Sequence, residues 1–385
     1  MSYKATYDAA KLNPEKFWME AAEKVDWITP PSKALFDDNA PFYEWFSDAE
    51  VNTCFNAVDR HVIAGNGKQT AIIYDSPITG KKSKISYLEL KEKTAKLGGL
   101  LKSQGVKKGD RIIIYMPMIP EAIIAMLACA RIGAIHSVVF GGFAANELAT
   151  RIDDCTPKVI LAGSCGVEPS GIIAYKPLID AAIDIATHKP EKCIIYQREI
   201  LHAELIEGRD LDWVKAQHGI IPAECEKMSG SDPAYILYTS GTTGQPKGVM
   251  LSHKNLVENV KITQNLAPFT NKWRALSFLP LNHVYERFLN TMYLFHDVSI
   301  YYAENFETIG DNCRELHPEM FVAVPRILER VLEKICAAGE KLTGFKKVIF
   351  NWSLNLAERF ELHGANGPWY ALQRKIADKL VYKKW

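Results

Sequence analysis

The sequence lacks several features that would assign a protein to a class at once. No stretch of 18 or more residues is uninterruptedly apolar, so no membrane-spanning helix is expected. The first ten residues are polar and contain no apolar secretory segment. The formal net charge is +1 over 385 residues, with basic and acidic residues interleaved. This balance argues against nucleic acid as a partner and against a polybasic membrane anchor.

Cysteine is present but not in pairs. None of the eight cysteines forms a C-x-x-C motif, so neither a zinc site nor a disulfide framework is predicted. Single, scattered cysteines are typical of a reducing compartment, which favours a cytoplasmic location and a role as small core residues. The cysteines are Cys54, Cys129, Cys155, Cys165, Cys193, Cys225, Cys313 and Cys336.

The sequence does contain enough apolar residues, 48%, for a large core. The first 65 residues are rich in aromatics, and Tyr43, Trp45 and Phe46 are predicted to pack inside. From residue 70, strand and helix patterns alternate, which predicts a mostly parallel sheet in a layered α/β/α fold. Residues 207–232 are polar and are predicted to be irregular. The strands are expected near 70–74, 111–115, 135–140, 158–162 and 193–196, and the helices near 86–105, 120–131 and 144–154.

The strongest chemical signal is a run of small residues, Thr239-Ser-Gly-Thr-Thr-Gly-Gln-Pro-Lys-Gly248. Strand patterns at 235–238 and 249–251 flank it, so the loop is predicted to join two strands. Small residues let backbone N–H groups approach an anion closely, and Lys247 adds a positive charge, a combination that suits a polyphosphate. The run is not a Walker A loop, because Pro246 precedes the lysine and Gly248 follows it. The alternative is a plain linker between strands.

This run resembles the phosphate loop of the adenylate-forming superfamily, which includes acyl-CoA synthetases, luciferases and peptide-synthetase adenylation domains. Residues 1–235 resemble acetyl- and propionyl-CoA synthetases, on motifs such as Gly109-Asp-Arg-Ile-Ile-Ile-Tyr-Met-Pro-Met118 and Gly133-Ala-Ile-His-Ser-Val-Val-Phe-Gly-Gly-Phe143. Residues 250–385 resemble long-chain fatty acid–CoA ligases, on Leu279-Pro-Leu-Asn-His-Val-Tyr-Glu-Arg-Phe288 and Phe321-Val-Ala-Val-Pro-Arg-Ile-Leu-Glu-Arg-Val331. The chain thus has the pattern of a chimera.

The resemblance implies a two-step reaction in which a small carboxylic acid reacts with ATP to give acyl-AMP, and coenzyme A then displaces AMP. It implies that the loop binds the phosphates, that Lys247 is their electrostatic partner or a structural anchor of the loop, and that Thr239 touches Mg²⁺. His283 is expected to shape the carboxylate site; the alternative is a histidine satisfied at a helix N-terminus. In the same motif, Glu286 and Arg287 could equally form a local ion pair with each other. The implied cofactor-binding residues are Thr239, Ser240, Gly241, Thr242, Thr243, Gly244, Lys247 and Gly248.

The resemblance leaves the acid open. The half after the loop favours a medium or long fatty acid and allows peripheral membrane contact, whereas the front half favours acetate or propionate. Residues 1–65 are expected to form an N-terminal segment and 66–385 an incomplete large domain, with the small mobile domain absent. The stretch at 168–171 also lacks the arginine that short-chain synthetases place near coenzyme A. The rival readings are a module that loads a carrier protein, a Walker-type ATPase and a non-catalytic fragment.

Overall fold

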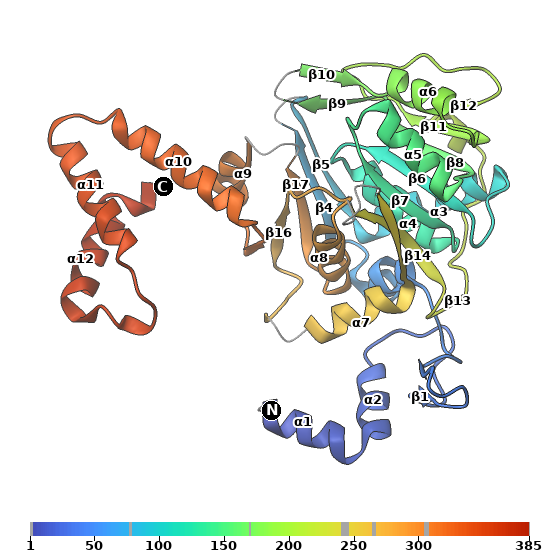
Figure 1. Cartoon of the computed structure of the whole chain (residues 1–385), viewed down its shortest axis with the longest axis horizontal. Coiled ribbons are helices and arrows are strands. Elements are labelled where there is room, and N and C mark those ends of the chain that lie inside the picture. Colours follow the sequence, from blue (N-terminus) through green and yellow to red (C-terminus); the bar gives the residue numbers. More distant parts are fainter. Residues whose placement is uncertain are drawn as a thin grey trace. The chain divides into compact units, whose positions relative to one another are not determined.

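The computed structural model describes residues 3–76, 79–168, 171–239, 246–263, 267–303 and 308–384. The chain divides into two compact units, Met1–Phe321 and Val322–Trp385. The first unit contains two mixed sheets and the helices that cover them, and the second is helical (Figure 1).

The larger sheet has seven strands in the order β12-β11-β8-β6-β7-β14-β15. All neighbours pair in parallel except β15, which is antiparallel to β14. The carboxyl ends of six strands therefore meet at one edge, beside the amino end of β15. The strands are β12 (Asp210–Asp212), β11 (Lys192–Tyr196), β8 (Val159–Gly163), β6 (Arg111–Met116), β7 (Ile135–Phe140), β14 (Pro233–Thr239) and β15 (Lys247–Ser252).

Helices cover this sheet, as expected for an α/β fold. One core cluster joins Ile113 and Tyr115 of β6 to Leu148 of α5 (Ala145–Cys155) and Ile179 of α6 (Lys176–Ile185). On β6 the alternate residues Ile112 and Ile114 are equally buried, so the other face is covered too. There α3 (Tyr87–Ser103) packs on α4 (Pro120–Arg131), which contacts β6 and β7. The predicted layered α/β fold is confirmed.

The second sheet has five strands in the order β18-β16-β17-β4-β5. It joins two distant parts of the sequence, because β4 pairs in parallel with β17 and antiparallel with β5. Three further helices follow along the chain: α7 (His253–Thr263), α8 (Val284–Phe295) and α9 (Ile309–Leu316). The strands are β4 (Thr70–Ser76), β5 (Lys81–Ser86), β16 (Arg274–Ser277), β17 (Ser299–Ala303) and β18 (Met320–Phe321).

The N-terminal segment packs through its aromatic residues. The Trp18 and Trp45 rings lie 5.4 Å apart at 68°, and Phe46 is buried beside them. Tyr43 is 57% exposed, so the prediction that it packs inside is wrong. The elements are α1 (Tyr3–Leu12), α2 (Pro14–Ala22), β1 (Leu35–Phe36), β2 (Glu44–Trp45), β3 (Glu50–Val51) and a helical segment at 53–66 that includes the π-helical turns Phe55–Asp59 and Val62–Asn66.

Residues 207–232 are not wholly irregular, contrary to the prediction. They contain the edge strand β12, a short 3₁₀ turn (Lys215–Gln217) and β13 (Met228–Ser229), which pairs with β3. Between them the backbone lies on α3: Ala223 N–H donates to Ala95 O at 2.8 Å. At Gly99 an added Cβ would stand 2.0 Å from Ile221 O, so only glycine fits. A hairpin of β9 (Cys165–Glu168) and β10 (Gly171–Ala174) precedes this segment.

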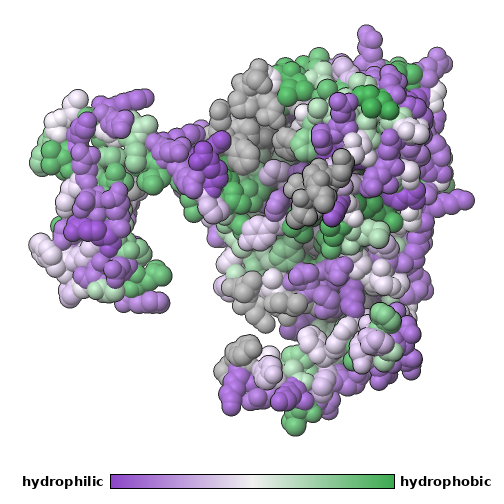
Figure 2. Space-filling model, in the orientation of Figure 1, coloured by the Kyte–Doolittle hydropathy of each residue, from purple (hydrophilic) through white to green (hydrophobic). Residues whose placement is uncertain are grey.

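The second unit, Val322–Trp385, consists of α10 (Pro325–Glu340), α11 (Gly344–Glu358) and α12 (Gly367–Leu380), with short 3₁₀ turns at Leu362–Gly364 and Tyr382–Lys384. Large apolar side chains are exposed on it, including Phe345 (77%) and Trp369 (71%). Figure 2 shows the apolar colouring that results on these helices. Over the described residues, none of the helices combines the length and the apolar character that a membrane crossing needs.

Candidate functional site

The β14–β15 hairpin places the ends of the glycine-rich loop together. Thr239, the last residue of β14, pairs with Lys247, the first residue of β15, and both are exposed. The prediction that this loop joins two strands is therefore confirmed. Ser240, Gly241, Thr242, Thr243 and Gly244 lie outside the described residues. Because β14 runs parallel to β7, Thr239 and Lys247 stand at the carboxyl edge of the sheet, where ligands of such folds bind.

Gly248 has a packing reason of its own. It pairs across the hairpin with Tyr238, and an added Cβ would stand 3.0 Å from Ile236 Cγ2 and 3.3 Å from Tyr238 Cε1. A Cβ at this position would require the Ile236 and Tyr238 side chains to shift by a few tenths of an ångström, directly beside Lys247. The absence of a side chain at Gly248 therefore favours close packing within the hairpin.

The end of β14 is attached to α5 by contacts that the sequence did not reveal. The Tyr238 hydroxyl donates to Asp154 Oδ2 at 2.6 Å. The Arg151 guanidinium lies over two rings, 5.1 Å from the centroid of Phe143 and 5.3 Å from that of Tyr238. Burial and the Asp154 carboxylate raise the pKa of Tyr238. These contacts fix the end of β14 against α5.

A second glycine loop follows β7 at the same edge. The Tyr115 hydroxyl donates to Phe143 O at 2.9 Å and accepts from Gly142 N–H at 3.0 Å. The Tyr115 ring meets Tyr175 edge to face, with 4.9 Å between centroids. At Gly141 an added Cβ would stand 2.4 Å from Tyr175 Oη. Two buried tyrosines therefore fix this loop, and the glycine lets the backbone pass against one of them.

His283 occupies the N-cap of α8. Its Nδ1 accepts from Tyr285 N–H at 3.3 Å, and the side chain is exposed. This is the geometry of the alternative reading, a histidine satisfied at a helix N-terminus. The β14–β15 hairpin brings Thr239, Lys247 and Gly248 together, whereas His283 lies on a different element, at the start of α8.

Glu286 and Arg287 have different partners, so the reading as a local ion pair is wrong. Glu286 accepts hydrogen bonds from the Ser277 hydroxyl and, at 3.0 Å, from Asn290 Nδ2. Burial, only partly offset by these donors, raises its pKa to about 7. The polar residues at 286, 287 and 290 in an otherwise apolar helix are the sequence feature that could have indicated these buried contacts.

Arg287 connects α8 to the seven-stranded sheet. Its Nη2 donates to His136 Nε2 at 3.0 Å, and its guanidinium lies 5.5 Å from the Tyr235 ring centroid. Burial and the neighbouring Arg287 charge lower the pKa of His136 well below its usual value, so His136 is neutral. This fixes β14 and β7 to α8 at the ends of the strands opposite to the glycine loops.

A family model for AMP-binding enzymes matches residues 59–358, and a model for the acetyl-coenzyme A synthetase N-terminus matches residues 3–57. The chain therefore belongs to the AMP-binding enzyme family, the adenylate-forming class that its loop predicted.

Two similar proteins have names that specify short acids. The chain is 50% identical over 249 residues to acyl-CoA synthetase short-chain family member 3, mitochondrial, of Rattus norvegicus, which is 64% of this chain and 36% of that protein. It is 41% identical over 251 residues to propionate–CoA ligase of Escherichia coli, 65% and 40% of the two chains. The chain thus spans little more than a third of the length of these relatives.

A solved structure shares the fold. The acetoacetyl-CoA synthetase from Streptomyces lividans superposes with a TM-score of 0.75 over 87% of this chain and 52% of that chain, at 21% sequence identity.

Proposed function

We propose that this chain belongs to an enzyme that joins a short carboxylic acid to coenzyme A through an acyl-adenylate. In the first step a carboxylate oxygen attacks the α-phosphorus of ATP, and pyrophosphate leaves. In the second step the coenzyme A sulfur attacks the acyl carbon, and AMP leaves. The observation that carries the proposal is the hairpin of the AMP-binding family at the carboxyl edge of the sheet, with Thr239 and Lys247 side by side.

Each site residue has a proposed task. Backbone N–H and hydroxyl groups of Ser240, Gly241, Thr242, Thr243 and Gly244 bind the β- and γ-phosphates, and Lys247 opposes their charge. The exposed hydroxyl of Thr239 is the kind of oxygen ligand that Mg²⁺ accepts while it keeps its waters and phosphate oxygens. When bound, Mg²⁺ supplies charge neutralisation to the phosphates. His283 is proposed to border the carboxylate site.

The relatives support a short acid such as acetate or propionate over the medium or long fatty acid that the second half of the sequence favoured. The long-chain reading remains the second candidate, because the motif at 279–288 belongs to the half that follows the loop.

The test is detection of acyl-AMP by mass spectrometry. The full 385-residue chain is mixed with Mg-ATP and equal amounts of acetate, propionate, octanoate and palmitate. We expect propionyl- or acetyl-AMP, and the matching thioester after coenzyme A is added. Octanoyl- or palmitoyl-AMP alone would replace the short acid by a long one. Folded protein that binds ATP but gives no acyl-AMP would show a nucleotide-binding fragment and overturn the proposal for this chain.

A further inference from the structure

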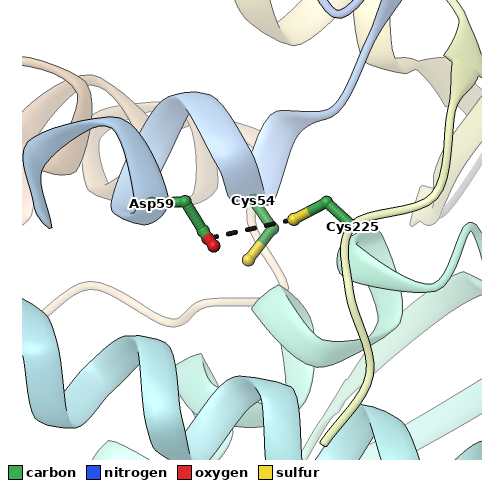
Figure 3. Close-up of side chains that lie close together, drawn as sticks. All are labelled: Cys54, Asp59 and Cys225. Atoms are coloured by element: carbon green, nitrogen blue, oxygen red, sulfur yellow. Dashed lines mark hydrogen bonds between the residues drawn. The ribbon is translucent and has the colours of Figure 1, made fainter. Parts of the chain in front are cut away.

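Two cysteines that are distant in the sequence meet beside Arg131, the last residue of α4. Cys54 lies in the helical segment at 53–66, and Cys225 lies in the backbone segment that crosses α3. Their sulfur atoms and a carboxylate oxygen of Asp59 all lie within 4.8 Å of one another (Figure 3). Cys225 Sγ donates to Asp59 Oδ2 at 3.8 Å. From the sequence, both cysteines were predicted to be single core residues.

Buried hydrogen bonds fix the two backbone segments against each other. Asn52 Nδ2 donates to Ala130 O at 3.0 Å and to Glu226 O at 2.9 Å, while Asn52 Oδ1 accepts from Cys54 N–H at 2.9 Å. Glu226 N–H donates to Arg131 O at 2.7 Å. One buried asparagine thus holds the residues beside both cysteines, so the approach of the sulfurs is preorganised.

Arg131 decides what this cluster can do. Its Nη1 and Nη2 donate to the two oxygens of Asp59 at 2.7 and 2.9 Å, and the arginine is 1% exposed. Lys91 Nζ lies 3.8 Å from Asp59 Oδ1. A divalent cation bound by the two sulfurs and Asp59 would stand beside two cations and would take the partner of a buried guanidinium. The carboxylate is already committed, and the two sulfurs remain as the reactive groups.

We propose that Cys54 and Cys225 are a redox-active dithiol site that a hydroperoxide converts to a disulfide. In the first step the Cys54 sulfur attacks a peroxide oxygen, the O–O bond breaks, and a sulfenic acid and one water form from hydrogen peroxide. In the second step the Cys225 sulfur attacks the Cys54 sulfur, the S–O bond breaks and a second water leaves. The two sulfurs lose two electrons and two protons, and the peroxide takes up both.

The surroundings separate Cys54 from Cys155 and Cys193. The neighbouring Cys225 thiol and the Arg131 guanidinium, whose Nη1 lies 3.6 Å from Cys54 Sγ, lower the pKa of Cys54 in spite of its burial. Burial instead raises the pKa of Cys155 to about 11 and that of Cys193 to about 12. Cys54 is fully buried and Cys225 only partly, so we expect a small oxidant to enter from the Cys225 side. The thiolate form is the reactive one, which favours Cys54 as the attacking sulfur.

The test is disulfide mapping on the full chain. Reduced protein is treated with hydrogen peroxide, remaining thiols are blocked with iodoacetamide, and the chain is digested without reductant. We expect a Cys54–Cys225 cross-linked peptide as the main disulfide product, and its loss on addition of dithiothreitol. Because the bond closes a long loop, Tm should rise by roughly 5 °C on oxidation.

Two variants and two contrary results define the outcome. Cys225→Ser should lose both the cross-link and the rise in Tm, while Cys313→Ser, which removes another partly buried cysteine, should keep both. Should Cys225→Ser fail to fold, the mapping on the unmutated chain still decides. Separate alkylation of Cys54 and Cys225 after oxidation would overturn the proposal. So would zinc bound one to one in untreated protein and absent from Cys54→Ser, since the cluster would then be a metal site. Neither readout depends on the proposed synthetase activity.

Discussion

At the scale of single residues, two buried carboxyl groups differ in the partners that the structure gives them. Glu286 is 2% exposed, and its hydrogen-bond partners are neutral groups. Asp59 is 4% exposed, and its partner is the buried guanidinium of Arg131. A buried carboxyl group therefore faces only neutral donors at one site and a guanidinium at the other.

Glu286→Gln should change the pH dependence of stability. The pKa of Glu286 is about 7 in the folded chain and 4.5 as the ordinary value, so the folded state binds more protons between these limits. Stability contributed by this group therefore falls as pH rises from 4.5 to 7, by about 3 kcal/mol in total. Glutamine keeps an oxygen acceptor for Ser277 and Asn290 but carries no charge. Urea denaturation at pH 5 and pH 8 should show the variant gaining on the parent only at pH 8.

The control is Glu92→Gln, which alters an exposed glutamate on α3. It should leave the pH profile unchanged. Equal gains for both variants at pH 8 would mean that Glu286 is not the titrating group.

Asp59→Asn should destabilise the chain by about 3–5 kcal/mol, because it leaves the buried Arg131 guanidinium without a charged partner. Arg131→Met in the same chain should recover most of the loss, since the replacement removes the charge and keeps the volume. Denaturant unfolding of both variants and of Arg131→Met alone measures the coupling. Additive losses in the double variant would show that the two groups do not interact.

At the scale of elements, two glycine-bearing loops at one sheet edge differ in how they are supported. The loop after β7 is fixed by buried tyrosines, whereas the loop after β14 stands on a hairpin whose base is tied to α5. The first loop is expected to respond to steric change and the second to loss of charge.

Gly141→Ala should cost about 1–3 kcal/mol, because its Cβ would meet Tyr175 at 2.4 Å and Tyr175 is 1% exposed. Gly310→Ala is the matched control: its nearest atom is at 3.6 Å and it lies in α9, so alanine should be neutral or stabilising. Thermal unfolding compares the two. A loss in Gly310→Ala as large as that in Gly141→Ala would contradict the steric explanation.

Lys247→Ala should lower kcat/KM for ATP by about 10²-fold, as expected when one preorganised charge is removed from a phosphate site. Gly241→Val should lower the ATP-dependent rate as well, because the side chain blocks close approach of the backbone. Pyrophosphate release with the acid identified above measures both. Lys272→Ala removes another exposed lysine and should change nothing. Parent-like rates in both loop variants would remove these residues from the proposed site.

At the scale of the whole molecule, the chain divides between β18 and α10. The first unit holds both sheets, and the unit Val322–Trp385 is helical with large exposed apolar side chains. The family model for AMP-binding enzymes nonetheless extends across the boundary to residue 358. The boundary of the compact unit, at residue 321, and the end of the family match, at residue 358, therefore do not coincide.

Limited proteolysis should cut first at the irregular residues 322–324. Thermolysin suits this stretch, because it cleaves before apolar residues such as Val322. We expect a fragment that ends near residue 321 to accumulate, and mass spectrometry identifies it. Early cleavage within the two sheets, with no such fragment, would show that the first unit is not the more resistant part.

Much of the fold followed from local sequence. Pro120–Arg131 and Ile135–Phe140 were predicted to the residue, because apolar runs and a proline at the helix start act over short distances. The capping box from Ser86 to Glu89 is present for the same reason. The hairpin around the glycine loop followed from the strand patterns on both sides.

What the tertiary structure decided involves residues far apart in the chain. Only the folded chain places Cys225 beside Cys54, Arg287 beside His136, and Asp154 beside Tyr238. It also leaves Tyr43 exposed. The sequence by itself determined the family, the hairpin around the glycine-rich loop and most elements, because these depend on residue type and short spacing. Burial, pKa shifts and the dithiol pair depend on which distant segments share a low-dielectric interior, and the structure alone determines that.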